Sequence, residues 1–331
     1  MAPLDAGRSP GLTPAARVFV AGGDTLPGAA LLDLLPAEGF TNLVGVGPDE
    51  PELTDALAVN SFFALEKPEY VFLVGGPSGG IGLNRARPAD LMLANLQVAT
   101  NVLDAAHRHG VRKLLYLASS CAYPREAPQP LEPASLGTGP LEPTSAAYAT
   151  AKLAGAVLCD AYRRQYGAQF ITAFPANPFG PGDDFGADSG HVIPALIRRA
   201  HEAAENGDRA LSVWGSGAAR REFLFSRDLA SACLFALKHY DGDAPLNLGG
   251  GTVLSIAEVA HAVANVVGFR GRLAFDTSKP DGAALKALDS SVLLGMGWQP
   301  ATRFHDAVHE TYHWFLHHEA AEGVSRERTT V

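Results

Sequence analysis

A tyrosine and a lysine four residues apart give this sequence a pair that could transfer protons. Tyr148 and Lys152 follow Pro143-Thr-Ser145, a segment typical of a helix start with Thr144 or Ser145 as N-cap. Residues four apart share one face of a helix, so the ammonium can lie beside the phenol and favour its ionised form. A phenol with an ordinary pKa of about 10 needs such help to exchange protons near neutral pH. The alternative is that the two side chains only pack together.

A serine and a cysteine stand just before this helix and could join the pair. The apolar run from Lys113 to Ala118 predicts a buried strand with Ser119 and Cys121 at its C-terminal end. Ligands collect at this end of the strands in parallel α/β sheets. The alternative for Cys121 is a small buried apolar side chain, which is common for a free cysteine.

The first strand, at Arg17 to Ala21, runs into the glycine-rich stretch Gly22-Gly-Asp-Thr25-Leu26-Pro-Gly28 and a helix through Leu35. Glycines at such a turn let the backbone approach a pyrophosphate, and the helix N-terminus offers free amides. The stretch departs from a G-x-x-G-x-x-G turn at Thr25, whose side chain is expected on the approach side, and Pro27 lacks an amide proton. We predict a dinucleotide site here, although a strand-to-helix turn that binds nothing could also use one of these glycines.

Strands and helices alternate along the rest of the chain. This alternation predicts an α/β fold with a doubly wound parallel sheet, Rossmann-like, followed by a smaller C-terminal substrate-binding domain. The expected division is a flexible tail at 1–16, a dinucleotide-binding domain at 17–176, a mainly substrate-binding region at 177–318 that returns some elements to the first domain, and a flexible tail at 319–331. Expected strands are 43–46, 70–74, 170–174, 211–213, 246–248 and 273–275, and expected helices are 53–65, 89–109, 192–204, 227–240, 255–267 and 304–316.

The amino-acid composition limits the kinds of binding partner that the protein can have. A formal net charge of -9 argues against nucleic acid or an anionic membrane as the main partner. The three cysteines form no C-x-x-C pair, so neither a disulfide framework nor a metal site is indicated. Without an apolar leader or membrane span, we expect a cytoplasmic protein, and a homodimer is the commonest assembly for such chains.

Six stretches together resemble the extended short-chain dehydrogenase/reductase family, and within it the epimerase/reductases that act on GDP-4-keto-6-deoxymannose. The resemblance runs from about Arg17 to Glu319. The stretches are Ser119-Ser-Cys121-Ala-Tyr-Pro, Leu141-Glu-Pro-Thr-Ser-Ala-Ala-Tyr148-Ala-Thr-Ala-Lys152, His191-Val-Ile-Pro-Ala-Leu-Ile-Arg198-Arg199, Val213-Trp214-Gly-Ser-Gly, Arg221-Glu-Phe and Ser278-Lys279-Pro-Asp-Gly.

The resemblance implies a role for each of these residues. Ser119, Tyr148 and Lys152 would form the hydride-transfer triad, with Cys121 and His191 exchanging protons at C3 and C5 of the sugar. The implied reaction converts GDP-4-keto-6-deoxy-D-mannose to GDP-L-fucose. The resemblance also implies that the nucleotide diphosphate is surrounded by Arg199, Trp214, Arg221 and Lys286. The residues that it implies for NAD(P)(H) binding are Gly22, Thr25, Leu26, Gly28, Tyr148, Lys152 and Asn177. Taken alone, His191 could be a helix N-cap, and each cation could lie on a solvated face.

The chain departs from this pattern at the cofactor. Relatives that use NADPH carry Arg, Gly and Arg where Asp24, Thr25 and Pro48 stand. A 2′-phosphate with about 1.5 to 2 negative charges would therefore face Asp24 without a cation. Each lost charge-assisted bond should cost about 1.5 to 3 kcal/mol. NAD(H) becomes plausible, with Asp49 or Glu50 for the ribose hydroxyls, and weak dinucleotide binding is the other possibility.

Three functional hypotheses follow. The first is the GDP-sugar 3,5-epimerase/4-reductase. The second is an epimerase or reductase of another nucleotide sugar that uses NAD(H). The third is a non-catalytic nucleotide-sugar-binding relative, which would have no chemical need for Ser119, Cys121, Tyr148, Lys152 and His191 together.

Overall fold

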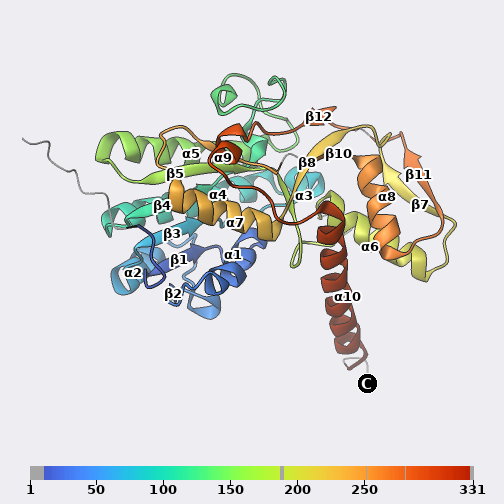
Figure 1. Cartoon of the computed structure of the whole chain (residues 1–331), viewed down its shortest axis with the longest axis horizontal. Coiled ribbons are helices and arrows are strands. Elements are labelled where there is room, and N and C mark those ends of the chain that lie inside the picture. Colours follow the sequence, from blue (N-terminus) through green and yellow to red (C-terminus); the bar gives the residue numbers. More distant parts are fainter. Residues whose placement is uncertain (1–10, 187–189, 251, 280, 329–331) are drawn as a thin grey trace, which may run out of the picture.

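A computed structural model describes residues 11–186, 190–250, 252–279 and 281–328, with side chains as far as His318. Two packed regions make up this part of the chain (Figure 1). One is built on a parallel sheet between two layers of helices, and the other on short strands with three helices. Each has its own cluster of buried apolar side chains.

The central sheet is six-stranded and parallel. In spatial order its strands are β2 (Leu43–Val44), β1 (Val18–Ala21), β3 (Tyr70–Leu73), β4 (Lys113–Leu117), β5 (Phe170–Pro175) and β9 (Leu246–Leu248). All but the edge strand β2 are buried along their length, because both faces of the sheet are covered. From β1 the chain first adds β2 on one side and then crosses to add β3 on the other side. In open α/β sheets, ligands bind in the crevice beside the point where the strand order reverses in this way.

Two helical layers cover this sheet (Figure 1). Helices α2 (Ala56–Glu66), α4 (Pro88–Arg108) and α5 (Ala146–Tyr166) pack side by side. Helices α1 (Leu26–Ala37) and α7 (Ser226–His239) pack against each other on the opposite face. A short helix, α3 (Ile81–Ala86), precedes α4. The prediction of a doubly wound parallel sheet is confirmed.

The second region combines small sheets with three helices. Its strands are β6 (Asn177–Phe179), β7 (Ala210–Trp214), β8 (Arg220–Phe225), β10 (Val253–Ser255), β11 (Arg272–Asp276) and β12 (Leu285–Lys286), and its helices are α6 (Val192–Glu205), α8 (Ile256–Val267) and α10 (Phe304–Arg328). Strand β8 pairs with β6, β10 and β12, and β7 pairs with β11. A short helix α9 (Ser291–Gly295) lies against β9. Because α7 and β9 lie after residue 177 yet pack with the first sheet, the chain passes between the regions more than once; the domain division itself stays a prediction.

The structure describes part of each expected tail, and their flexibility stays a prediction. Residues 11–16 end in a turn in which the amide of Ala16 donates to the carbonyl of Thr13, and of these residues only Ala16 is buried. Residues 319–328, expected to be a tail, continue α10 to Arg328, because this stretch is rich in Ala, Glu and Arg and has no proline. Residues 1–10 and 329–331 lie outside the described residues.

Candidate active site

Ser119 and Cys121 lie where β4 ends at the carboxyl edge of the sheet. The amide of Ala118 donates to Ala173 of the neighbouring β5 at 2.8 Å, which fixes the backbone just before the site. Ser119 is the N-cap of the 3-10 turn Ser120–Ala122, and its hydroxyl accepts the amide of Cys121 at 3.2 Å. The turn therefore holds the serine hydroxyl and the thiol close together.

Tyr148 and Lys152 lie on α5, which begins after Ser145 as the sequence indicated. Helix α5 is tied to β4 by Tyr116, whose hydroxyl donates to the carbonyl of Lys152 at 3.2 Å. Gly155 permits this approach, because a Cβ there would lie 2.5 Å from the Tyr116 hydroxyl. The sequence signal for this contact is weak, since a glycine inside a helix does not say what it packs against.

Lys152 is fully enclosed between α5 and the sheet. Its side chain is buried, and Nζ donates to the carbonyl of Gly75 at 3.1 Å and lies 6.0 Å from the centroid of the Tyr148 ring. Burial lowers the pKa of Lys152 to about 8. Lys152 is thus oriented by a backbone carbonyl, and no Asp or Glu of the described ranges forms an ion pair with it.

The phenol of Tyr148 does not show the lowered pKa expected beside Lys152. Burial raises its pKa, and the nearby Cys121 adds to that effect, while a hydrogen bond with the Ser119 hydroxyl opposes it. The expectation fails here because the phenol is desolvated and the ammonium is directed at Gly75. A raised pKa favours the protonated phenol, which suits a proton donor.

Cys121 carries the reactive thiol of the site. Burial alone would raise its pKa, but Lys286, Ser119 and His191 outweigh burial and lower it. The ammonium of Lys286 donates to Sγ at 3.7 Å. By contrast, burial raises the pKa of Cys159 to about 12. The two thiols therefore have different chemistry, and Cys121 is the one poised to ionise.

His191 occupies the N-cap position of α6 without capping it through its side chain. Its Nδ1 lies 3.6 Å from Oδ1 of Asp183, slightly beyond hydrogen-bond distance, and the Asp183 side chain is almost fully buried. This carboxylate raises the pKa of His191 against the opposing effect of burial. Sequence reasoning missed Asp183, which stands in an irregular segment beside the equally acidic Asp184.

Ser119, Cys121, Tyr148, Lys152 and His191 are therefore brought together as expected, through the contacts and charge interactions described above. Lys286 joins them, although it was expected at the diphosphate. Asn177 lies on β6, and its Nδ2 donates to the carbonyl of Glu222 on β8 at 2.7 Å, so the structure gives it a role in holding these strands together.

A second cluster of predicted residues surrounds an exposed tryptophan. Trp214 ends β7 with 56% of its area exposed. The Arg199 guanidinium lies 5.9 Å from its ring centroid, and the ammonium of Lys279 lies 5.5 Å from it. Cations over an exposed indole form a surface suited to an anionic or aromatic ligand.

Arg221 is held by the loop before β12. Its Nη1 donates to the carbonyl of Ala283 at 2.6 Å, and that loop is tied to the turn after β7 by Asp281, whose Oδ1 accepts the amide of Ser216 at 2.6 Å. Strand β12 pairs with β8 so that Lys286 is opposite Arg221. The short β12 strand therefore links the tryptophan cluster to the thiol.

The glycine-rich turn has the close approaches expected of a dinucleotide-binding turn. A Cβ on Gly22 would lie 2.2 Å from Gly75, and one on Gly28 would lie 1.9 Å from the carbonyl of Gly22. Thr25 corrects the expectation for its side chain: its Oγ1 donates to the Gly22 carbonyl at 2.7 Å and accepts the Gly28 amide at 3.2 Å. The threonine is the N-cap of α1 and faces the turn itself. Leu26, the first residue of α1, keeps an amide with no acceptor inside the helix.

Glu50 reaches the same turn from the segment after β2. Its carboxylate accepts the amides of Gly22 at 2.5 Å and Gly23 at 3.1 Å. Burial raises the pKa of Glu50 despite these two donors, and Asp24 adds to the rise. The glycines and the Leu26 amide fit a dinucleotide, whereas the carboxylates of Glu50 and Asp24 place negative charge beside the turn.

Comparison with known proteins decides the family. Residues 18–249 match the NAD dependent epimerase/dehydratase family model. The chain belongs to this family. It is 48% identical to GDP-L-fucose synthase 1 of Arabidopsis thaliana over 301 residues, which cover 91% of this chain and 93% of the relative. It is 41% identical to the GDP-L-fucose synthase of Escherichia coli over 312 residues, covering 92% of this chain and 97% of the relative.

Solved structures of the family agree with these relatives. The chain is similar to a GDP-L-fucose synthetase from Naegleria fowleri bound to NADP, with a TM-score of 0.85, 30% identity, and coverage of 94% of this chain and 97% of that one. The epimerase/dehydratase fold and NAD(P)(H) as the cofactor class are thereby confirmed. The resemblance noted from the six sequence stretches is confirmed as well.

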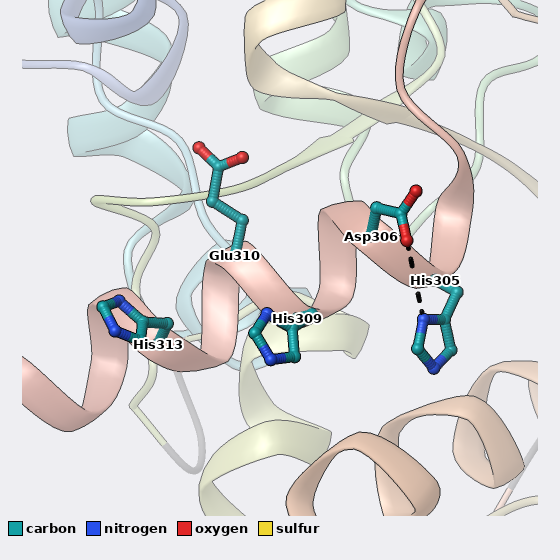
Figure 2. A pocket seen from close by; sticks show the side chains of 5 residues that line it. All are labelled: His305, Asp306, His309, Glu310 and His313. Carbon is teal, nitrogen blue, oxygen red and sulfur yellow. Dashed lines mark ion pairs between the residues drawn. The ribbon is translucent and has the colours of Figure 1, made fainter.

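A hollow elsewhere in this epimerase/dehydratase is lined by His305, Asp306, His309, Glu310 and His313 (Figure 2). All five lie on α10, which carries none of the predicted site residues, and their side chains point in different directions. Nowhere in the described ranges do three or more His, Cys, Asp or Glu side chains come together as a metal site would require. Nor does any described helix have the length and apolar character to cross a membrane.

Proposed function

We propose that this protein converts GDP-4-keto-6-deoxy-D-mannose to GDP-L-fucose, by epimerisation at C3 and C5 followed by reduction at C4. The relatives named GDP-L-fucose synthase support the substrate. One observation carries the mechanism: the environments of Cys121 and His191 shift their pKa values in opposite directions at one site. Such a pair supplies a base and an acid at the same pH.

The proton steps follow from the substrate's ketone. A carbonyl at C4 acidifies the protons on C3 and C5, so a modest base can remove them. Cys121, with its lowered pKa, removes a proton as the thiolate. His191, with its raised pKa, returns a proton from the opposite side as the imidazolium. Each exchange inverts the configuration of one carbon.

The reduction uses the other half of the site. A bound nicotinamide dinucleotide supplies the hydride for C4. Tyr148, kept protonated by burial, donates its proton to the C4 oxygen, and Ser119 holds the phenol in place through their hydrogen bond. Lys152, buried beside the phenol, stabilises the phenolate that remains.

We further propose that NAD(H) is preferred over NADP(H). The exposed Asp24 and the carboxylate of Glu50 flank the turn where adenosine binds, and Pro48 offers no charge. A 2′-phosphate would meet carboxylates there, whereas the two ribose hydroxyls of NAD(H) could donate to them.

Arg199, Trp214 and Arg221 are assigned to the GDP moiety, because Arg199 lies over the Trp214 ring and Arg221 is held by the loop before β12, which also contacts the turn after β7. A homodimer in the cytoplasm is proposed from general expectation for proteins of this kind.

Separating the two half-reactions tests the proposed function. In deuterated buffer with a GDP-4-keto-6-deoxyhexose, Tyr148→Phe should still incorporate deuterium at C3 or C5 while forming little reduced sugar. Cys121→Ala should block much of the exchange, and Lys152→Ala should behave like Tyr148→Phe. A positioned proton donor is worth about 10²- to 10⁴-fold in rate, so NADH absorbance would reveal its loss. If Tyr148→Phe stops exchange as fully as reduction while GDP still binds, the division of roles is wrong.

A further inference from the structure

We infer that Lys286 is the counter-ion that holds Cys121 as a thiolate, and is thereby a positioning residue for the proton steps. Only the role of the thiolate in proton exchange rests on the proposed function. The observation is the contact of the Lys286 ammonium with Sγ of Cys121 at 3.7 Å, between residues that are 165 positions apart in the sequence. A lysine that served only the diphosphate would not need to reach the thiol.

The backbone on both sides of this contact is firmly placed. Lys286 ends β12, opposite Arg221 of β8. The next two residues are fixed by side chains of other elements: the amide of Ala287 donates to Oε1 of Gln129 at 3.0 Å, and the amide of Leu288 donates to Oε2 of Glu222 at 2.7 Å. These bonds set the position from which the lysine side chain reaches the thiol.

Cys121 itself cannot move far. Its amide donates to the Ser119 hydroxyl at 3.2 Å in the 3-10 turn after β4. The ammonium and the thiol are therefore held together by two independently anchored backbones. This pre-organisation makes the contact stronger than one between two flexible surface side chains.

The charged and titratable groups around Cys121 come from three other elements. They are Lys286 on β12, His191 at the start of α6 and Tyr148 on α5. Among the described residues no Asp or Glu forms an ion pair with Lys286, so its charge is directed at the sulfur. His191 has Asp183 as its own partner, which leaves Lys286 as the main positive charge on the thiol.

The other two cysteines show what happens without such a partner. Cys159 and Cys233 are buried in the first apolar core, and burial raises the pKa of each. Cys121 is partly exposed, so a small reagent can reach it. Alkylation at neutral pH should therefore report on Cys121 alone.

The test is the pH dependence of Cys121 alkylation in the cofactor-free, substrate-free protein. Iodoacetamide reacts with the thiolate, and peptide mass spectrometry follows Cys121 separately. In Lys286→Met the midpoint should rise by about one unit, so alkylation near pH 7 should slow about tenfold. Lys286→Gln should do the same, and Lys286→Arg, which keeps the charge, should retain most of the rate. Lys238→Met removes a surface lysine of α7 and should leave the midpoint unchanged.

Proton exchange with the GDP-sugar gives the second readout. In Lys286→Met, exchange at C3 or C5 should fall near pH 7 and recover as the pH rises through the new midpoint. A lysine that only binds diphosphate would raise KM without moving the pH profile. An unchanged midpoint in both Lys286→Met and Lys286→Gln overturns the inference, whatever the activity. A raised midpoint in a protein whose wild type exchanges no proton would keep the inference and reject the proposed reaction.

Discussion

Oδ1 of Asp183 lies 3.6 Å from Nδ1 of His191 and raises the pKa of that histidine. Because the raised pKa belongs to the folded state, this pair stabilises the protein below the unfolded histidine pKa of about 6.5, and the stabilisation is lost as pH rises through the folded value. If His191 is the acid of the proton steps, its active fraction falls through the same range. In the proposed mechanism, Asp183 therefore sets the upper pH limit of epimerisation.

Asp183→Asn should lower the pKa of His191 and move the alkaline fall of deuterium exchange to lower pH. NMR titration of the His191 imidazole would measure the first effect, and exchange rates across pH the second. Asp184→Asn is the matched control: its carboxylate is the weakest of the influences on His191, so a small shift is expected. A His191 pKa that is unchanged in Asp183→Asn would contradict this account.

Cofactor choice provides the second prediction. NADH should support reduction at least about tenfold better than NADPH in kcat/KM, since one missing charge-assisted bond is worth that much. Introducing two cations, Asp24→Arg with Pro48→Arg, should reverse much of this preference. Asp33→Arg, the same type of substitution as Asp24→Arg but on the exposed side of α1, should leave the preference unchanged. NADPH use equal to NADH use in the wild type would reject the prediction.

The buried Lys152 predicts a specific pH dependence of stability. Its folded pKa of about 8 is below the unfolded value of about 10.4, so between these values the unfolded chain binds more protons. The wild type should therefore gain up to about 3 kcal/mol over Lys152→Met between pH 8 and 10.4. Urea unfolding of both proteins at pH 7 and pH 10 measures this gain. A difference between the two proteins that is the same at both pH values would show that Lys152 is not desolvated.

Gly155 predicts an effect of packing on catalysis. Alanine normally stabilises a helix relative to glycine by about 0.5 to 1 kcal/mol. At Gly155 the new Cβ would collide with Tyr116, so Gly155→Ala should destabilise the protein by about 1 to 3 kcal/mol and slow reduction. Gly295→Ala, in α9 with open space around it, is the control and should not destabilise. Thermal unfolding of the two variants gives the comparison.

Much of the fold follows from patterns that a single sequence displays. The apolar runs of β1, β3, β4 and β5 and the amphipathic or capped helices between them were located to within a few residues. Strand β8 was not predicted, because its first residues, Arg220-Arg-Glu222, are polar. Glu222 is nevertheless buried, and its partners, such as the Leu288 amide, are distant in sequence. The full length of α10 was not predicted, because its last turns lack an apolar pattern.

The candidate site was predictable by residue type and less so by contact. Tyr148 and Lys152 are a local helical pair, and Ser119 with Cys121 follows a buried strand, so short-range spacing was enough. Lys286 at the thiol, Asp183 at the histidine and Glu50 at the glycine turn depend on chain segments that meet only in the folded protein. Residue spacing along the sequence does not predict these long-range contacts.

Strand β9 completes the first sheet only after the chain has already built β6, α6, β7 and β8. The second packed region is therefore interrupted in sequence by α7 and β9, which pack with the first sheet. A chimera that imports another protein's substrate pocket would have to exchange two separate stretches and leave α7 and β9 in place. A single cut after β5 would instead leave an open strand edge, with unpaired amides and carbonyls ready to associate with another chain.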